Sequence, residues 1–313
     1  MVALGAAGGL LLRIDPALAE AVVFRALSHA ELMAPERVAG HRRRIDLLYS
    51  SSEPSERDAA FGRLAVEEFE ALDLFRPIHQ ALTERPGLAD SVRVVFLGEA
   101  GGRLDEGITC EPAGAHLGIR VEARRLDDPG GLLAWARHAL GHAEDTLDPA
   151  FGFEPGWEEV VRRRLGSAAV GRLHRLWDVT VDARLSAAGR LVAGPALGRH
   201  RSAIAADLPG VARPAIERVV ACLWARPRPT FPTLRSWVER PIDLLRVAAP
   251  GEMGRPRPDR CPLCGFPSQD IVRPDPAVGA LVSADYPDWR PEDGLCGRCT
   301  DLFRFGGRLG ARR

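Results

Sequence analysis

Two histidines, His138 and His142, stand four residues apart in a stretch that predicts a helix. Side chains at positions i and i+4 lie on one face of a helix, so both imidazoles can bind the same zinc ion. Asp145 follows at i+7 on the same stripe. Two histidines can reach this spacing by chance and bind nothing. Gly141, which allows a second helix to approach closely, and the acidic residues that follow favour a metal site.

A zinc site of this kind needs a third protein ligand. The next long helical stretch offers His174, Asp178 and Asp182, which are spaced by four and share a face. We expect Asp182 or Asp178 to be the third ligand and Asp145 to be a ligand or to support one. The alternative is that these groups are solvated surface charges paired with nearby arginines.

Residues 138–152 read HALGHAEDTLDPAFG. The expected sheet, the HxxxH helix and the following helix with Asp178 and Asp182, over about residues 90–190, resemble the zincin-type metallopeptidases. The segment 138–152 is most similar to a group of bacterial zincin-like proteins with the signature HELGHxxDxLDPAFG. It departs from that signature at Ala139, where the family has the glutamate that takes a proton from zinc-bound water. The resemblance implies a zincin-like fold centred on about residues 90–190 and a zinc site, and it supplies no substrate.

Ala139 carries no ionisable group, so the general base of such a peptidase is missing. Loss of a general base costs roughly 10²–10⁴-fold in rate. Glu144 lies about 200° around the helix from His142 and points away from the site. Glu106 and Glu111, in a loop rich in glycine, are the candidates for a substitute base. We therefore expect a pseudoenzyme or a weak hydrolase.

Four of the six cysteines form two CxxC pairs. Cys261 and Cys264 form the first pair, and Cys296 and Cys299 follow about thirty residues later. Each CxxC turn brings two thiolates to one tetrahedral ion, so the pairs predict a structural Zn²⁺ in a zinc-ribbon or treble-clef module. A zinc ion with four cysteine ligands has no open position and performs no hydrolysis.

The composition argues against a nucleic-acid or membrane partner. The formal net charge is zero, and the chain contains no lysine and no asparagine, which is typical of a GC-rich bacterial genome rather than of a nucleic-acid-binding protein. Between the cysteine pairs acidic residues outnumber basic ones, which disfavours phosphate contacts. No apolar run has the length of a membrane span, the N-terminus lacks the charged start of a signal peptide, and paired CxxC motifs suit a reducing cytoplasm. We expect a cytoplasmic protein.

The pattern along the chain predicts an α+β fold rich in helices. Two strands are expected, at 91–97 and 118–123, between helices such as 16–27, 56–72 and 168–188. We expect a helical, zincin-like domain with a small sheet over 1–248, a linker rich in proline and glycine over 249–259, and the cysteine module over 260–306.

Two functions fit these features. The first is a zinc-binding, metallopeptidase-like protein with a peptide or protein as substrate or partner. It would hold one structural zinc at the cysteines and a second at His138 and His142. The alternative is an interaction protein without enzymatic activity, in which zinc has a structural role only.

Overall fold

The protein is an α+β structure, as its sequence predicts. The computed structural model describes residues 2–7, 10–30, 34–51, 53–110, 116–208, 211–225, 228–248, 261–266, 268 and 271–305. The chain divides into two compact units, Met1–Glu239 and Arg240–Arg313. The expected linker 249–259 lies outside the described residues, and the expected three-part division stays a prediction.

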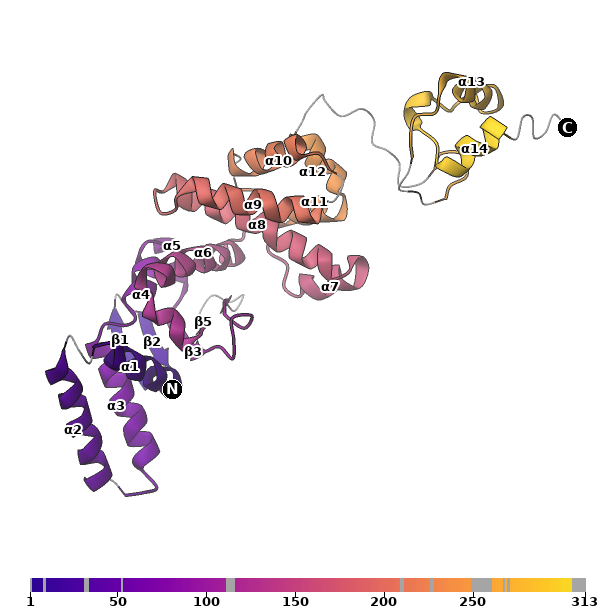
Figure 1. Ribbon diagram of the computed structural model, residues 1–313. Helices are drawn as coiled ribbons and strands as arrows, with labels where there is room; N and C mark the ends of the chain where they lie inside the picture. Colours follow the sequence, from indigo (N-terminus) through magenta and orange to yellow (C-terminus); the bar gives the residue numbers. More distant parts are fainter. Residues whose placement is uncertain are drawn as a thin grey trace. The chain divides into compact units, whose positions relative to one another are not determined.

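The first unit contains a small mixed sheet (Figure 1). Its strands are β1 (Val2–Ala7), β2 (Leu10–Ile14), β3 (Val94–Glu99), β4 (Gly107–Cys110) and β5 (His116–Val121), in the order β1-β2-β3-β5-β4. The central strands β2, β3 and β5 are parallel, whereas β1 and β4 are antiparallel edge strands. The strand expected at 91–97 is β3, in which Val95 and Leu97 are buried in the core and their neighbours are less so.

Helices make up the rest of the first unit. Between β2 and β3 the chain forms the helices α1 (Pro16–Ala30), α2 (Pro35–Ser51), α3 (Arg57–Ala71), α4 (Arg76–Thr83) and α5 (Pro86–Ser91). After the sheet come the 3₁₀ turn η1 (Ala123–Asp127), α6 (Pro129–Leu147), α7 (Trp157–Leu165), α8 (Ser167–Ala187), α9 (Ala193–Asp207), α10 (Arg213–Ala225) and α11 (Phe231–Glu239). Helix α6 packs against the edge strand β4 and also against α8, which places it between the sheet and the later helices (Figure 1).

The second unit contains α12 (Pro241–Ala248), α13 (Pro276–Asp285), the 3₁₀ turn η2 (Pro291–Asp293) and α14 (Gly297–Phe305). A single antiparallel bridge joins Val272 and Leu295. The buried side chains of this unit's own core cluster are Cys261, Val278, Val282, Trp289, Leu295, Cys296 and Cys299.

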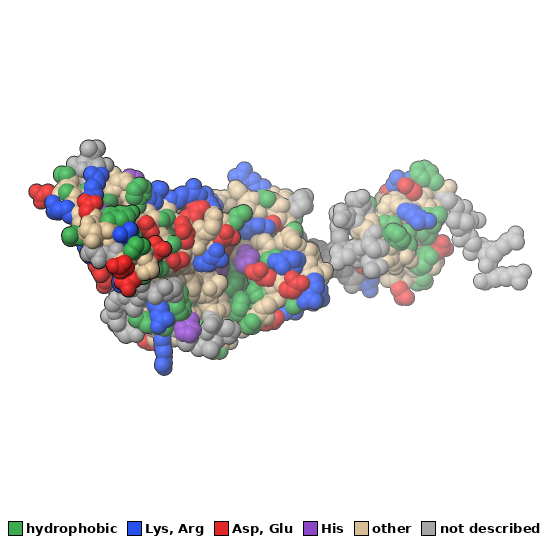
Figure 2. Space-filling model, turned by 90° about the horizontal axis from the view of Figure 1, so that it is seen from below, with side chains coloured by type: hydrophobic (Ala, Val, Ile, Leu, Met, Phe, Trp, Pro, Cys, Tyr) green, Lys and Arg blue, Asp and Glu red, His purple; other side chains and the backbone are tan. Residues whose placement is uncertain are grey.

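Acidic and basic side chains are interspersed over the face of the molecule shown in Figure 2. Many of them form ion pairs, such as those of Arg44 with Glu67 and Glu68. Among the described residues, no helix is both long enough and apolar enough to cross a membrane.

Candidate metal centres

Local sequence sets where α6 begins and how closely it approaches α8. Asp128 caps the helix by accepting a hydrogen bond from the backbone N–H of Gly131 at 2.9 Å, and Pro129 occupies the first turn. A Cβ atom at Gly141 would lie 2.6 Å from Cγ1 of Val181, which is too close for any side chain. The glycine therefore permits the contact between the two helices that brings the predicted ligands together.

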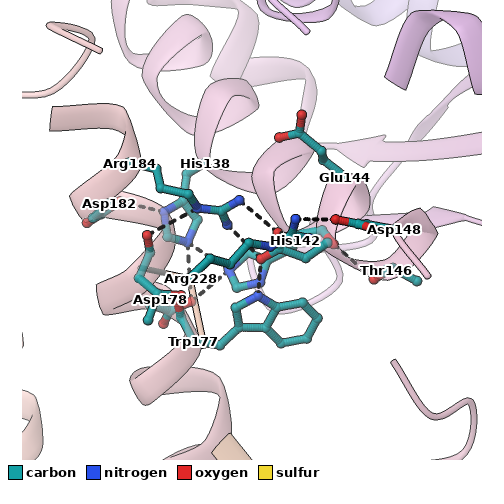
Figure 3. Close-up of polar contacts among 12 residues, drawn as sticks. His138, His142, Glu144, Thr146, Asp148, Trp177, Asp178, Asp182, Arg184 and Arg228 are labelled. Atoms are coloured by element: carbon teal, nitrogen blue, oxygen red, sulfur yellow. Dashed lines mark hydrogen bonds and ion pairs between the residues drawn. The ribbon is translucent and has the colours of Figure 1, made fainter. Parts of the chain in front are cut away.

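His138 and His142 on α6 face Asp178 on α8 (Figure 3). The two Nε2 atoms lie 3.2 Å apart, and Oδ1 of Asp178 lies 3.2 Å from Nε2 of His138 and 2.9 Å from Nε2 of His142. A tetrahedral zinc ion with bonds of about 2.0–2.1 Å separates its ligand atoms by about 3.3 Å. The three atoms therefore form one face of a site of the right size, and their side chains are between 22% and 33% exposed.

Asp182, the other candidate for the third ligand, lies behind His138. Its Oδ1 accepts a hydrogen bond from Nδ1 of His138 at 2.7 Å, and its Oδ2 lies 2.9 Å from Nε2 of His200 on α9. A carboxylate on the far nitrogen of a metal-binding histidine fixes which nitrogen carries the proton and how the ring is oriented. Of the two carboxylates expected as ligands, Asp178 is therefore grouped with the two histidines. Asp182 instead contacts the opposite ring nitrogen of His138.

Asp145 lies apart from the histidine group. It is fully buried, and its carboxylate pairs with Arg184 and Arg228 and accepts a hydrogen bond from Nε1 of Trp177 at 2.6 Å. The ring of Trp177 packs edge-on against that of His142, with centroids 4.5 Å apart. The contacts of Asp145 with the histidines therefore run through Trp177, although its charge also acts on His142. Its ion pairs join α6 to α8 and to the segment that precedes α11.

The other predicted residues lie elsewhere. Glu106 is buried in an ion pair with Arg125 and accepts a hydrogen bond from the backbone N–H of Glu122, which lower the pKa of its carboxyl despite burial. This arrangement disfavours Glu106 as a base. Glu111 lies outside the described residues. His174 contacts Glu158 at 3.1 Å and is not part of the group.

The Glu144 carboxylate turns away from the histidines, as expected (Figure 3), and pairs with Arg85 at 2.5 Å.

The acids raise the proton affinity of one histidine. Burial alone would lower the pKa of His138, but hydrogen bonds and charges from Asp178 and Asp182 outweigh it and raise the pKa to about 9. Burial, together with the charge of His138, lowers the pKa of His142. The same contacts overcome the effect of burial on the two acids and hold the pKa of Asp178 well below its usual range and that of Asp182 at about 2. A metal ion must therefore compete with a proton for His138.

This titration predicts a specific pH dependence for the metal-free protein. The pKa of His138 is about 9 in the folded state and about 6.5 in an unfolded chain. Its contribution to the free energy of unfolding is fully present below about pH 6.5 and is lost as the pH rises through about 9. Urea unfolding after chelation should show this decline, and the difference between wild type and His138→Gln isolates it from other groups. A pH-independent difference would contradict the assignment.

The four cysteines of the second unit also converge. Their sulfur atoms lie within 4.8 Å of one another, and Sγ of Cys264 lies 3.8 Å from Sγ of Cys296. Tetrahedral zinc with bonds of about 2.3 Å separates its sulfur ligands by about 3.8 Å. The first pair lies in a turn closed by Gly265, whose φ is +67°, and the second pair begins α14. The four thiols therefore have the spacing that a closed tetrahedral metal site would require, as the sequence predicts.

His200, which contacts Asp182, was not predicted as a site residue. It lies on α9, a helix that was not predicted, because its first half contains two glycines and a proline. A signal was present, since the buried residues Ala196, His200 and Ile204 are spaced by four. That spacing predicts a helix with His200 on its buried face.

Comparison with known proteins adds no relative. No family model, curated protein or solved structure matches the chain. The resemblance of about residues 90–190 to zincins therefore stays a prediction. Within the part of the chain that the structure describes, two groups of side chains could hold a metal ion.

Proposed function

We propose that this chain is a zinc-binding, metallopeptidase-like protein that acts as a pseudoenzyme or as a weak hydrolase. The observation that carries the proposal is the convergence of His138, His142 and Asp178 from two helices onto one triangle of ligand atoms. Two imidazoles and a carboxylate are a common donor set for zinc that keeps a position open. When bound, zinc supplies a Lewis acid that polarises a carbonyl group and acidifies water.

The surroundings of the candidate acids support a pseudoenzyme over an efficient hydrolase. Position 139, next to His138, is alanine. Asp182 is shared by two histidines, Asp145 is held by two arginines, and Glu144 and Glu106 are each paired with an arginine. A carboxylate held in an ion pair is a poor proton acceptor, because protonating it breaks the pair. None of these four groups is poised as a general base.

The second unit is proposed to hold a structural zinc ion and to dock on a peptide or protein partner. Its second cysteine pair lies at the start of α14, with Cys296 just before the helix and Cys299 in its first turn. Large apolar side chains that are exposed on this unit support a docking role: Phe266, Val272, Leu281, Tyr286, Leu302 and Phe305. The alternative function, an interaction protein in which zinc has a structural role only, would have the same cysteine module but would bind no zinc ion at His138 and His142.

Zinc stoichiometry tests the proposal. Purified full-length protein should contain about two zinc ions per chain, and His138→Ala should contain about one, because the cysteine site closes without the histidines. His174→Ala serves as the matched control, since His174 lies on α8 but contacts Glu158 instead of the centre. Elemental analysis gives the ratio. One zinc in the wild type, unchanged in His138→Ala, would overturn the histidine site and leave the structural role.

A further inference from the structure

The buried histidine His200 lies one step behind the proposed zinc ligands, at the end of a short chain of contacts. Nδ1 of His138 donates to Oδ1 of Asp182 at 2.7 Å, and Nε2 of His200 lies 2.9 Å from Oδ2 of the same carboxylate. Both Asp182 and His200 are less than one-tenth exposed. The chain joins three helices, α6, α8 and α9, at the rear of the centre.

We propose that His200 is a positioning residue, which holds the Asp182 carboxylate so that His138 presents Nε2 to the metal. This inference rests on the proposed zinc site. Metal binding through Nε2 requires the proton of His138 to sit on Nδ1, the nitrogen that faces Asp182. Asp182 can enforce that tautomer only while its own orientation is fixed.

The terminal torsion of an aspartate side chain is soft, so one hydrogen bond leaves the carboxylate plane free to rotate. Two donors, one on each oxygen of Asp182, define the plane. His138 and His200 supply them. Arg199 also approaches Oδ2 of Asp182, but only to 3.8 Å and with a side chain that is 64% exposed. Water therefore screens its electrostatic attraction for the carboxylate. His200 is therefore the group that fixes the far side of the carboxylate.

The fold in turn holds His200 firmly. Ala196 and Ile204, one turn before and one turn after it on α9, are buried to within 2%. Its ring also lies 6.1 Å from that of Trp224 on α10, measured between centroids. A histidine packed in this way has little freedom to turn, so its Nε2–H stays directed at Asp182.

The test compares variants of the full-length protein that differ only in the donor at position 200. His200→Gln keeps an N–H that can reach Asp182, whereas His200→Met has a similar size and no donor. The affinity for the second equivalent of zinc, with the cysteine site loaded, is measured by competition with a chromogenic chelator. Loss of a group behind a metal ligand costs 10–100-fold in metal affinity, and we expect about tenfold for His200→Met. His200→Gln should stay within about threefold of wild type.

Each outcome decides a different point. A folded His200→Met protein with the affinity of the wild type would overturn the role of His200, as would a His200→Gln protein that loses as much as His200→Met. If His200→Met does not fold, judged by its helical circular dichroism and its thermal melt, His200→Ala replaces it as the variant without a donor, and its zinc affinity is compared with that of His200→Gln. A wild type that binds no second zinc would overturn the metal site itself and, with it, this inference.

Discussion

Replacing Ala139 by glutamate should raise hydrolysis of a denatured protein substrate by about 10²–10⁴-fold over the wild type. The ligand triangle of His138, His142 and Asp178 would be unchanged, since residue 139 is not part of it. What the wild type lacks is a group that accepts a proton from the attacking water, and each carboxylate described near the centre is already paired. Release of peptides from a labelled substrate measures the gain.

Ala139→Gln is the matched control, because glutamine has the size of glutamate and cannot act as a base. It should show no gain, and chelation should abolish the gain of the glutamate variant. If Ala139→Glu carries two zinc ions and still hydrolyses nothing beyond the glutamine variant, the centre is not the remnant of a peptidase site. The resemblance to zincins would then be one of sequence pattern, without the chemistry of a peptidase.

Much of the candidate metal centre could be predicted, because the sequence signals for it are local. The spacing of His138 and His142 depends only on helix geometry, and the cap at Asp128 lies beside the helix that it starts. Gly141 was also correctly interpreted, since a glycine inside a helix usually marks a close approach. The same locality explains the confirmed cysteine cluster, in which each pair is a self-contained turn.

The partners of Asp145 could not be predicted, because they depend on tertiary contacts. Arg184 and Arg228 are ordinary arginines in a sequence whose basic residues are all arginine, and only the packing of α8 and the segment before α11 brings them to one carboxylate. Helical spacing placed Asp145 on the stripe with the histidines. It did not show that Trp177 would stand between them.

The sheet was predicted only in part for a similar reason. The strands β3 and β5 have an alternating or β-branched pattern and were expected, within a few residues of their observed ends. The strands β1, β2 and β4 were not expected. In particular, β2 is stabilised by parallel pairing with β3, in which Ile14 lies opposite Leu97 across more than eighty residues of sequence. Such pairing leaves no signal in a local window.

Replacing Cys261 by serine should unfold the cysteine module. Three of the seven buried side chains in its core cluster are themselves cysteines of the metal site, so without zinc the core is reduced to Val278, Val282, Trp289 and Leu295. A domain near 40 residues rarely folds without a metal or disulfides, and a structural zinc contributes about 10–16 kcal/mol to folding. The apolar side chains that remain cannot replace that contribution.

Hydrogen exchange gives a direct readout of this loss. The amides of Val272 and Leu295 are hydrogen-bonded to each other's carbonyl oxygens at 2.9 and 2.8 Å in the wild type. They should lose protection in Cys261→Ser, while amides of α6 and α8 keep theirs. Cys110→Ser is the control, because Cys110 is a half-buried thiol on β4, outside the cluster. If the two amides stay protected in Cys261→Ser, apolar packing holds the module together and zinc is not its structural centre.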